Sequence, residues 1–505
     1  MPSVDSSPAE SAGILRSSWL PNLCLTLPFL LLFWVNLAHH DMWLDELNAW
    51  GLSAASPTLR VVLANVRYEG HPWLWYFLLW IPSRFTHAPV AMKWVEAFIG
   101  AATYLIIGML SPFSRLQKVL VFLSYFVVFE YTVISRTYGP MLLFAFLYAW
   151  RRSAKPSAVF GNMVLLGALA STDLLGIFLS FALLLEYAAF YWKRWRETDV
   201  RRAIAGALCY LLLLAISVET LRPASDISWA TTGHLFAKAG SLHHLIHSIG
   251  DVLVAVWWPF ATGYPHQYWN TDVDFNHSEL YFVPLVFAGM FWVFRKQRNL
   301  LLLVGTSLFL TIAFVHLVYT GYVRHWGIVV LAFLIAFWIL CSESQGRRKV
   351  SRVAYLFLIV GALRGVGAVA ASWTHPFSET GNVAAFLRAN HLADQPLVGP
   401  SDYNLAGVAE QLQRPAYFLN CNCTDTYMKF SHRRDGMTPD EVPSRIARAY
   451  RVLNVPKITL VMPDPLSEEY LRKLAAEGFT VRPLAEFSGA EDHLSFHLYE
   501  AQKAE

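Results

Sequence analysis

The chain has 505 residues, of which 55% are hydrophobic and 15% charged, and its formal net charge is +4 at pH 7. In soluble domains about a quarter of all residues are charged, so this composition excludes an ordinary soluble protein. The basic residues lie in short clusters, which excludes a nucleic-acid-binding surface and predicts no nucleic-acid partner. We therefore expect a polytopic α-helical membrane protein.

A polar tail at residues 1–19 precedes the first long apolar run, at residues 20–38. The run is followed by two histidines and an aspartate rather than by the small residues of a cleavage site, so we expect a retained anchor. Segments long enough to cross a bilayer then recur along a transmembrane domain at residues 20–373. Eleven fit, beginning near residues 20, 92, 116, 138, 157, 173, 203, 280, 299, 326 and 353.

Basic clusters set the expected orientation of these segments. They occur at residues 151–155, 193–202, 295–298 and 346–352, and mark cytoplasmic loops of a cytoplasmic (inner) membrane protein. The N-terminus is then inside, and the first loop at 39–71 and everything after about Trp373 are outside. Two shorter apolar segments, at 73–80 and 252–260, are expected to be interfacial or partial helices. If both crossed fully, the total would be thirteen.

Residues 374–505 have a different composition. Helical and strand-like segments alternate, which predicts a small α/β domain outside the membrane with a mainly parallel sheet. None of the strands is followed by a glycine-rich phosphate loop, so nothing indicates a nucleotide site. Cys421 and Cys423 either pair with each other or remain free or intermolecular thiols.

The stretch DMWLDELNAW places Asp41, Asp45 and Glu46 directly after the first span. Carboxylates at a membrane surface are common, and these three can simply end the span and cap a surface helix. Alternatively, Asp45 or Glu46 takes a proton from an acceptor hydroxyl or amine. Neighbouring residues on a helix point about 100° apart, so one of this pair would act and the other would orient it.

In the stretch RYEGHPWLWY, Gly70 and Pro72 break a helix and present Glu69 and His71 at the membrane surface. The surrounding aromatic residues are typical of an interfacial anchor. An interfacial anchor does not require a glutamate and a histidine, and these two lie on the same side of the membrane as the Asp-Glu pair. We therefore treat both as candidates for binding the acceptor or the sugar.

Two external helix ends carry arginines, in SRTYGP (Arg136) and in YVRHWG (Arg324, followed by His325). Basic residues are disfavoured on that side of a membrane. Each arginine either pairs with an acidic loop residue or binds a phosphate through bidentate hydrogen bonds. The orientation places these residues on the face that carries Asp45 and Glu69, and the sequence therefore predicts one site.

A metal site has weaker support. His243, His244 and His247 have spacings that can ligate a metal, but no matching carboxylate motif accompanies them. We favour a surface amphipathic helix and assign no metal ligands. A divalent metal requirement stays open.

The order of these motifs resembles that of the GT-C superfamily of integral-membrane glycosyltransferases. The resemblance rests on the Asp-Glu pair in the first external loop, the His-Pro element that follows it, and the R-x-Y tip formed by Arg136 and Tyr138. The branches most similar are the protein O-mannosyltransferases and the lipid A aminoarabinose transferases. The resemblance implies a polyprenyl-phosphate sugar as donor, Asp45 as base with Glu46 beside it, and phosphate binding by Arg136, Arg324 and His325. It also implies acceptor or sugar binding by Asp41, Glu69, His71 and Tyr138.

The expected function is therefore sugar transfer, with inversion, from a polyprenyl-phosphate donor to an envelope glycan, lipid or protein at the external membrane face. Two alternatives stay open. One is an envelope polysaccharide ligase, polymerase or phospho-group transferase. The other is a non-catalytic membrane protein whose external domain binds a partner or a glycan.

Overall fold

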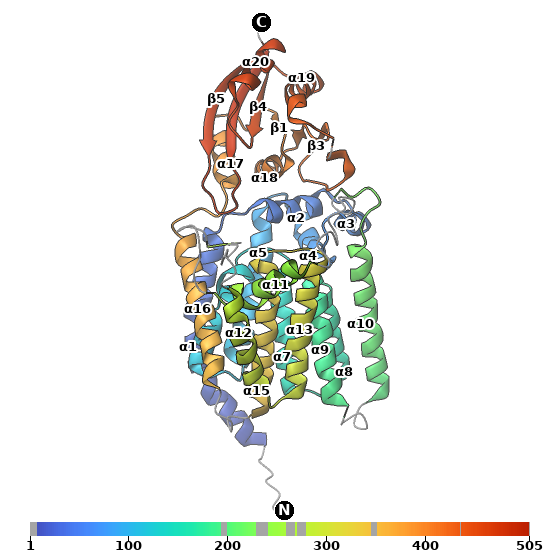
Figure 1. The fold of residues 1–505 in the computed structure, drawn as a ribbon, viewed down its shortest axis with the longest axis vertical. Helices are drawn as coiled ribbons and strands as arrows, with labels where there is room; N and C mark the ends of the chain where they lie inside the picture. Colours follow the sequence, from blue (N-terminus) through green and yellow to red (C-terminus); the bar gives the residue numbers. More distant parts are fainter. Residues whose placement is uncertain are drawn as a thin grey trace, which may run out of the picture.

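The computed structural model describes residues 8–192, 199–228, 241–258, 268–269, 279–344, 351–434 and 436–503. A bundle of long helices carries an α/β domain at one end, and helix α1 begins at the opposite end (Figure 1). Every one of the eleven segments expected to span begins on, or within two residues of, a helix of this bundle. These are α1 (Pro8–His39), α5 (Val90–Leu105), α6 (Arg115–Phe122), α7 (Tyr138–Ala154), α8 (Val159–Ala170), α9 (Leu174–Tyr191), α10 (Val200–Leu221), α12 (Glu279–Phe294), α13 (Arg298–Leu317), α15 (Ile328–Ser344) and α16 (Arg352–Ser372).

Within the described ranges, seven helical stretches are long and apolar enough to cross a membrane. They are Trp19–His39, Val90–Leu110, Leu174–Tyr191, Val200–Leu221, Arg298–Leu317, Val323–Glu343 and Arg352–Ser372. The other four expected spans are shorter helices. Helix α6 shows the reason, because it stops after eight residues and the chain resumes as the π-helix η2 (Phe126–Glu130). A second π-helix, η1 (Ile106–Leu110), extends α5.

The two short apolar segments form short helices, as expected. Residues 73–80 lie mostly in α4 (Leu74–Ser83), whose ten residues rise only about 15 Å, half of a bilayer core. It lies at the end of the bundle next to α2 (Leu44–Ala55) and α3 (Leu59–Val66) (Figure 1). Part of the segment 252–260 forms the buried π-helix η4 (Asp251–Ala255) after α11 (Leu242–Gly250), and its last two residues lie outside the described residues.

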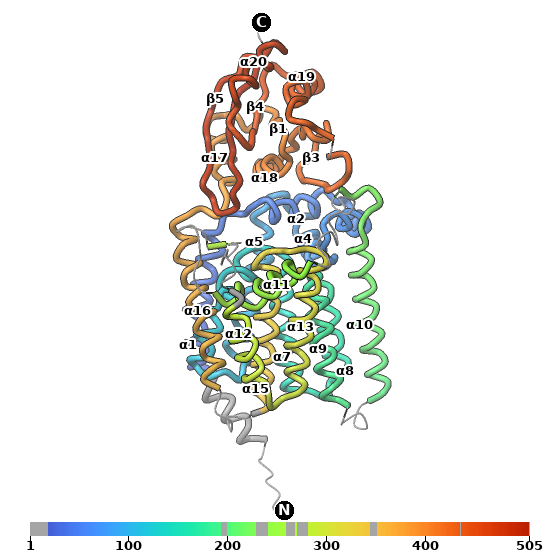
Figure 2. The backbone as a smooth tube through the Cα atoms, viewed as in Figure 1, coloured from blue at the N-terminus to red at the C-terminus, as the bar shows by residue number. Residues whose placement is uncertain are grey.

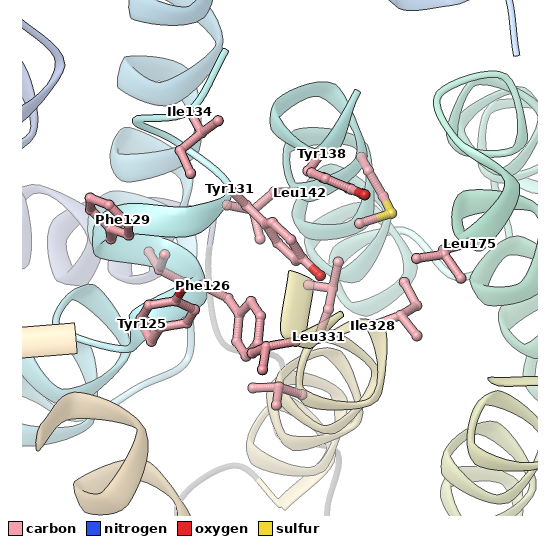
Figure 3. Close-up of a cluster of buried hydrophobic side chains, with 14 of the residues drawn as sticks. Tyr125, Phe126, Phe129, Tyr131, Ile134, Tyr138, Leu142, Leu175, Ile328 and Leu331 are labelled. Carbon is pink, nitrogen blue, oxygen red and sulfur yellow. The ribbon is translucent and has the colours of Figure 1, made fainter. Parts of the chain in front are cut away.

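Aromatic side chains of η2 and α7 pack against α9 and α15 beneath this end of the bundle (Figure 3). The ring of Tyr131 stacks on that of Tyr138, with centroids 5.0 Å apart, and the Tyr131 hydroxyl donates a 2.6 Å hydrogen bond to the carbonyl of Arg324. Gly327 makes this approach possible, because a Cβ there would lie 2.0 Å from the ring of Phe126. The cluster therefore fixes the short helix α14 (Val323–Trp326), which carries Arg324.

The C-terminal domain contains one six-stranded sheet in the order β3-β2-β1-β4-β6-β5. Helices α17 and α18 pack with one face of the sheet, and α19 and α20 with the other. The strands are β1 (Leu397–Gly399), β2 (Ala416–Phe418), β3 (Cys423–Asp425), β4 (Lys457–Met462), β5 (Phe479–Phe487) and β6 (Phe496–Lys503). The helices are α17 (Thr380–Ala389), α18 (Asp402–Leu412), α19 (Val442–Leu453) and α20 (Glu468–Ala476), with the 3-10 turns η5 (His432–Arg434) and η6 (Pro439–Glu441).

The expected α/β class is correct, but the expectation of a mainly parallel sheet is wrong. Only the pairs β1–β2 and β1–β4 are parallel, whereas β2–β3, β4–β6 and β5–β6 are antiparallel. The physical reason is connection length, since β2–β3 and β5–β6 are joined by loops too short for a crossover helix. Cys421 and Cys423 form a disulfide with each other at the first of these turns.

The α/β domain rests directly on α2 (Figure 2). Gly51 of α2 permits this contact, because a Cβ there would lie 2.3 Å from the Glu410 carboxylate of α18. Asn48, one turn earlier on α2, accepts a 2.6 Å hydrogen bond from the backbone N–H of Met428. The helix that carries Asp45 is thus held from above by the C-terminal domain.

Candidate functional site

A cavity of about 700 Å³ lies between the end of the bundle and the C-terminal domain. One part of its wall is polar and carries predicted site residues from separate segments, namely Asp45, Glu69, His71, Arg136, Arg324 and His325. The remaining wall is largely apolar and includes Leu174, Leu175, Leu221, Phe314, Val318 and Met428. The cavity can therefore hold a ligand with a polar head and an apolar tail.

Asp45 lies in the first turn of α2 and is 28% exposed. Its Oδ2 atom is 2.6 Å from Nη1 of Arg136 and 4.0 Å from Nη2 of Arg324. Both guanidinium groups are mostly buried. Burial lowers the pKa of Arg136 to about 10, so it remains charged at neutral pH. One carboxylate thus faces two cations at the cavity wall.

Trp43 packs with both arginines. Its ring centroid is 5.8 Å from the guanidinium of Arg136 and 5.4 Å from that of Arg324. Trp269 lies edge-on to Trp43 and 5.1 Å from the Arg324 guanidinium. Aromatic faces attract cations without using their N–H groups. The rings therefore hold the arginines in place and leave their hydrogen-bond donors available.

Arg324 is less completely hydrogen-bonded than Arg136 in the part of the chain that the structure describes. Among the described residues, its buried Nε and Nη1 atoms lack a hydrogen-bond partner. An unpaired buried polar group is costly, and more so when it is charged. Arg324 also lines the cavity, so its positive charge lies next to any anionic ligand there.

Glu46 has different surroundings from its neighbour Asp45. It is fully buried, and it accepts hydrogen bonds from the backbone N–H groups of Trp43 at 3.1 Å and Ser135 at 2.6 Å. His40 Nε2 lies 2.8 Å from the same carboxylate. Glu46 is not part of the cavity wall. It caps α2 and ties the helix to the segment before Arg136, so it orients the site rather than facing it.

A chain of contacts fixes Arg136 from its other side. Its Nη2 is 3.2 Å from Nε2 of His71, and His71 Nδ1 is 3.0 Å from Oδ2 of Asp173. Arginine can only donate, so His71 accepts at Nε2 and carries its proton on Nδ1 toward Asp173. Asp173 also accepts hydrogen bonds from Thr137 and from the N–H of Leu175, as the N-cap of α9. Burial would raise the pKa of Asp173, but these hydrogen bonds outweigh it and lower the pKa to about 2.

Glu69 is the second carboxylate of the cavity wall. It accepts hydrogen bonds from the Asn48 amide at 3.1 Å and from the Tyr76 hydroxyl at 3.4 Å. Burial raises the pKa of Glu69 to about 7, with His71 and the hydrogen bonds acting in the opposite direction. Its protonation state therefore changes near neutral pH.

Besides Glu46, two further predicted residues lie outside the cavity wall. Asp41 lies beside His39 and Phe377 rather than in this wall, and burial raises its pKa. Tyr138 is buried beneath the site, stacked on Tyr131. His325 does line the cavity, and its Nδ1 accepts a hydrogen bond from the backbone N–H of Tyr322 at 2.9 Å.

The part of the chain that the structure describes contains no group of three or more His, Cys, Asp or Glu side chains arranged to hold a metal. His243 and His247 have their Nε2 atoms 3.2 Å apart on α11.

The sequence did not single out Trp43, Asn48, Asp173 and Trp269 as site residues. Asp173 stands directly before an apolar run, which is the usual position of a helix N-cap. This position predicts a cap but does not reveal that the same carboxylate also contacts His71. Trp43 and Trp269 look like ordinary interfacial aromatics in the sequence. Their contacts with Arg324 arise only from the fold.

The fold and the cavity define a polytopic helical membrane protein with an α/β domain over the end of its bundle. The solved structure of ArnT from Cupriavidus metallidurans in the apo state has a similar fold, with a TM-score of 0.54 at 13% sequence identity. The similarity covers 96% of this chain and 98% of that one. No family model matches the sequence, and no curated protein matches it significantly.

Proposed function

We propose that this protein is a membrane glycosyltransferase that moves a sugar from a polyprenyl-phosphate donor to an acceptor at the external face of the membrane. The ArnT-like fold supports the class of enzyme. The observation that carries the proposal is the pairing of Asp45 with two arginines at the wall of a cavity that is otherwise largely apolar. A donor of this class has a phosphate for the arginines and a prenyl chain for the apolar wall.

In the proposed donor complex, Arg136 and Arg324 bind the phosphate that links the sugar to the lipid. Guanidinium groups form bidentate, charge-assisted hydrogen bonds with phosphate. The position of Arg324 in the cavity wall, beside Asp45, favours this binding. As the phosphate takes over the hydrogen bonds of Arg136, Asp45 loses its ion pair and becomes a stronger proton acceptor. Donor binding thereby activates the base.

The transfer itself is a single displacement. The acceptor oxygen, or nitrogen, bonds to the anomeric carbon while the bond from that carbon to the phosphate oxygen breaks. The acceptor proton passes to Asp45, and the bonding electron pair leaves with the polyprenyl phosphate, which both arginines stabilise. The anomeric centre is inverted. Glu69 accepts a hydrogen bond from the acceptor or the sugar beside this centre.

The alternatives make different products in the same cavity. A polysaccharide ligase or polymerase would transfer a whole glycan, and a phospho-group transferase would move the phosphate with the sugar. A scaffold would release no polyprenyl phosphate. Of these alternatives, the phospho-group transferase and the scaffold give the arginines no departing polyprenyl phosphate to hold, whereas the ligase or polymerase differs from the proposed enzyme in the size of the glycan that it transfers.

The proposal is tested by mass spectrometry of lipids that co-purify with the full-length protein. A polyprenyl-phosphate sugar should be found with the wild type and be depleted in Arg136→Ala. Lys296→Ala, an exposed residue in the loop between α12 and α13, is the control and should retain it. If the lipid were equally abundant in Arg136→Ala, or if the sugar were linked through a diphosphate in every preparation, the assigned donor site would be wrong.

A further inference from the structure

A second cavity lies within the C-terminal domain, next to the first. Its volume is about 370 Å³, and its wall includes Asp402, Phe418, Asp425, Lys429 and Arg433. It lies where the parallel strands β1 and β2 end, since Phe418 is the last residue of β2 and Asp402 follows β1. Ligands of open α/β sheets bind outside the carboxyl ends of the strands. The domain thus has a ligand pocket where such sheets usually have one.

The two cavities are neighbours. Met428 lines both, and Tyr68, which lines the first cavity, contacts two residues of the second. Its hydroxyl donates a 2.5 Å hydrogen bond to Asp226, and its ring lies 4.3 Å from Lys429 Nζ. The edge of the domain with β3 and α18 faces the bundle (Figure 1). Tyr68 and Met428 therefore separate the second cavity from the first.

The wall of the second cavity is also linked to Glu69, the second carboxylate of the first cavity. Asn48 of α2 accepts the hydrogen bond of the Met428 N–H, and its amide donates to Glu69. The turn that carries Met428 also carries Lys429 and follows the disulfide between Cys421 and Cys423. A ligand held by this turn would lie in fixed relation to Glu69.

The chemistry of the wall indicates the kind of ligand. The wall includes carboxylates (Asp226, Asp402, Asp425), basic groups (Lys429, Arg433, Arg434) and the aromatic residue Phe418. Asp402 is held by Arg434, whose Nη2 is 2.7 Å from its Oδ1, so this pair is an internally neutral element of the wall. Mixed acceptors and donors suit a group that offers many hydroxyls, each able to donate and accept. A wall with only basic groups would suit an anion instead, and a wall with only acidic groups would suit a cation.

We propose that this second cavity is an acceptor subsite, which binds a hydroxyl-rich sugar of a glycan acceptor whose next unit reaches past Tyr68 to Asp45. The inference rests on the proposed function, because it assigns the acceptor of the same transfer. It makes the acceptor a glycan rather than a simple lipid or a protein side chain. It also gives the C-terminal domain a part in acceptor recognition.

The test is binding of the purified full-length protein to an array of neutral and phosphorylated oligosaccharides. Neutral oligosaccharides should bind, and Asp425→Asn and Lys429→Met should each weaken binding roughly tenfold, the effect of losing one hydrogen bond to a charged group. Arg472→Ala, an exposed residue of α20, should bind as the wild type does. Thermal unfolding and binding of polyprenyl phosphate establish that each variant is folded.

Each outcome decides one of the two claims. If no oligosaccharide bound, if only phosphorylated ones bound, or if both variants bound like the wild type, the acceptor subsite would be refuted. Sugar transfer with an unchanged acceptor KM in Asp425→Asn would refute the subsite while the proposed function stands. Oligosaccharide binding that depends on Asp425, without transfer of any sugar, would refute the proposed function and leave the glycan site in place.

Discussion

Nη1 of Arg136 lies 2.6 Å from Oδ2 of Asp45, and the opposite side of the same guanidinium lies 3.2 Å from Nε2 of His71. The arginine is therefore held between the carboxylate of Asp45 and the imidazole of His71. A phosphate that enters the cavity competes with the carboxylate and leaves the histidine contact in place. The following predictions depend on this arrangement.

Loss of Arg324 is expected to weaken donor binding. Arg324→Met keeps an unbranched apolar side chain beside Trp43 and Trp269 but removes the guanidinium group, so affinity for polyprenyl phosphate should fall about 10- to 100-fold. Arg324→Lys keeps the charge without the planar fork and should be intermediate. The measurement is equilibrium binding in nanodiscs, with Lys296→Met as the control. Equal affinity of Arg324→Met and wild type would contradict the phosphate assignment.

Asp173→Asn is expected to disturb Arg136 through His71. An asparagine amide can donate to Nδ1, which favours the tautomer whose Nε2–H points at the Arg136 donors. We expect kcat/KM for transfer to fall roughly tenfold or more, as an imidazole in the wrong tautomer lowers rates in other enzymes.

The matched control for that variant is Asp199→Asn. Asp199 is the N-cap of α10, just as Asp173 is the N-cap of α9. Both variants weaken a helix cap, but only Asp173 contacts a histidine of the cavity. If the two variants lowered transfer equally, the effect of Asp173 would be on folding and not on Arg136.

The pH dependence of transfer should include an inflection from Glu69. Burial raises its pKa to about 7, so its carboxylate is mostly protonated below that pH and ionised above it. The ionised form accepts the stronger hydrogen bond, and kcat/KM for the acceptor should therefore rise as pH passes through about 7. Glu69→Gln should lose this rise. An inflection that persisted in Glu69→Gln would belong to another group.

Stability should also depend on pH, through Glu410. Burial against α2 raises its pKa from 4.5 to about 8, so the folded state holds a proton that the unfolded state releases. The contribution of Glu410 to the free energy of unfolding is therefore largest below pH 4.5 and is lost as the pH rises through about 8. Tm of the wild type should fall by a few degrees relative to Glu410→Gln over this range. Glu477→Gln, an exposed control, should follow the wild type.

The sequence was sufficient to predict the helical bundle, because the apolar segments are local and their lengths are set by the bilayer. It did not show where helices are interrupted, as between α6 and η2, since that depends on packing around Tyr125 and Phe126. In the C-terminal domain, alternation of helices and strands predicted the class. Strand-like runs were evident at residues 396–400, 416–420 and 457–463, where β1, β2 and β4 lie. The strands β3, β5 and β6 were missed, and with them the antiparallel pairs.

The sequence predicted site residues only where a charged or polar residue stood at an expected external helix end or loop. Asp45, Glu69, His71, Arg136, Arg324 and His325 line one cavity, and each had been selected as a polar or basic residue at an external helix end or loop. Asp173 and Asn48 could not be found in this way. Their importance lies in side-chain partners far away in the chain, His71 and Met428, which the fold alone brings together.

The most direct test of the central claim is the kinetics of Asp45→Asn in reconstituted membranes. The substitution keeps the side-chain shape but removes the proton acceptor, so transfer from a polyprenyl-phosphate sugar should fall about 10²- to 10⁴-fold. Because the variant no longer competes for Arg136, affinity for the donor should be unchanged or higher. Undiminished transfer by a folded Asp45→Asn protein would contradict the account, as would a loss of transfer explained entirely by weaker donor binding.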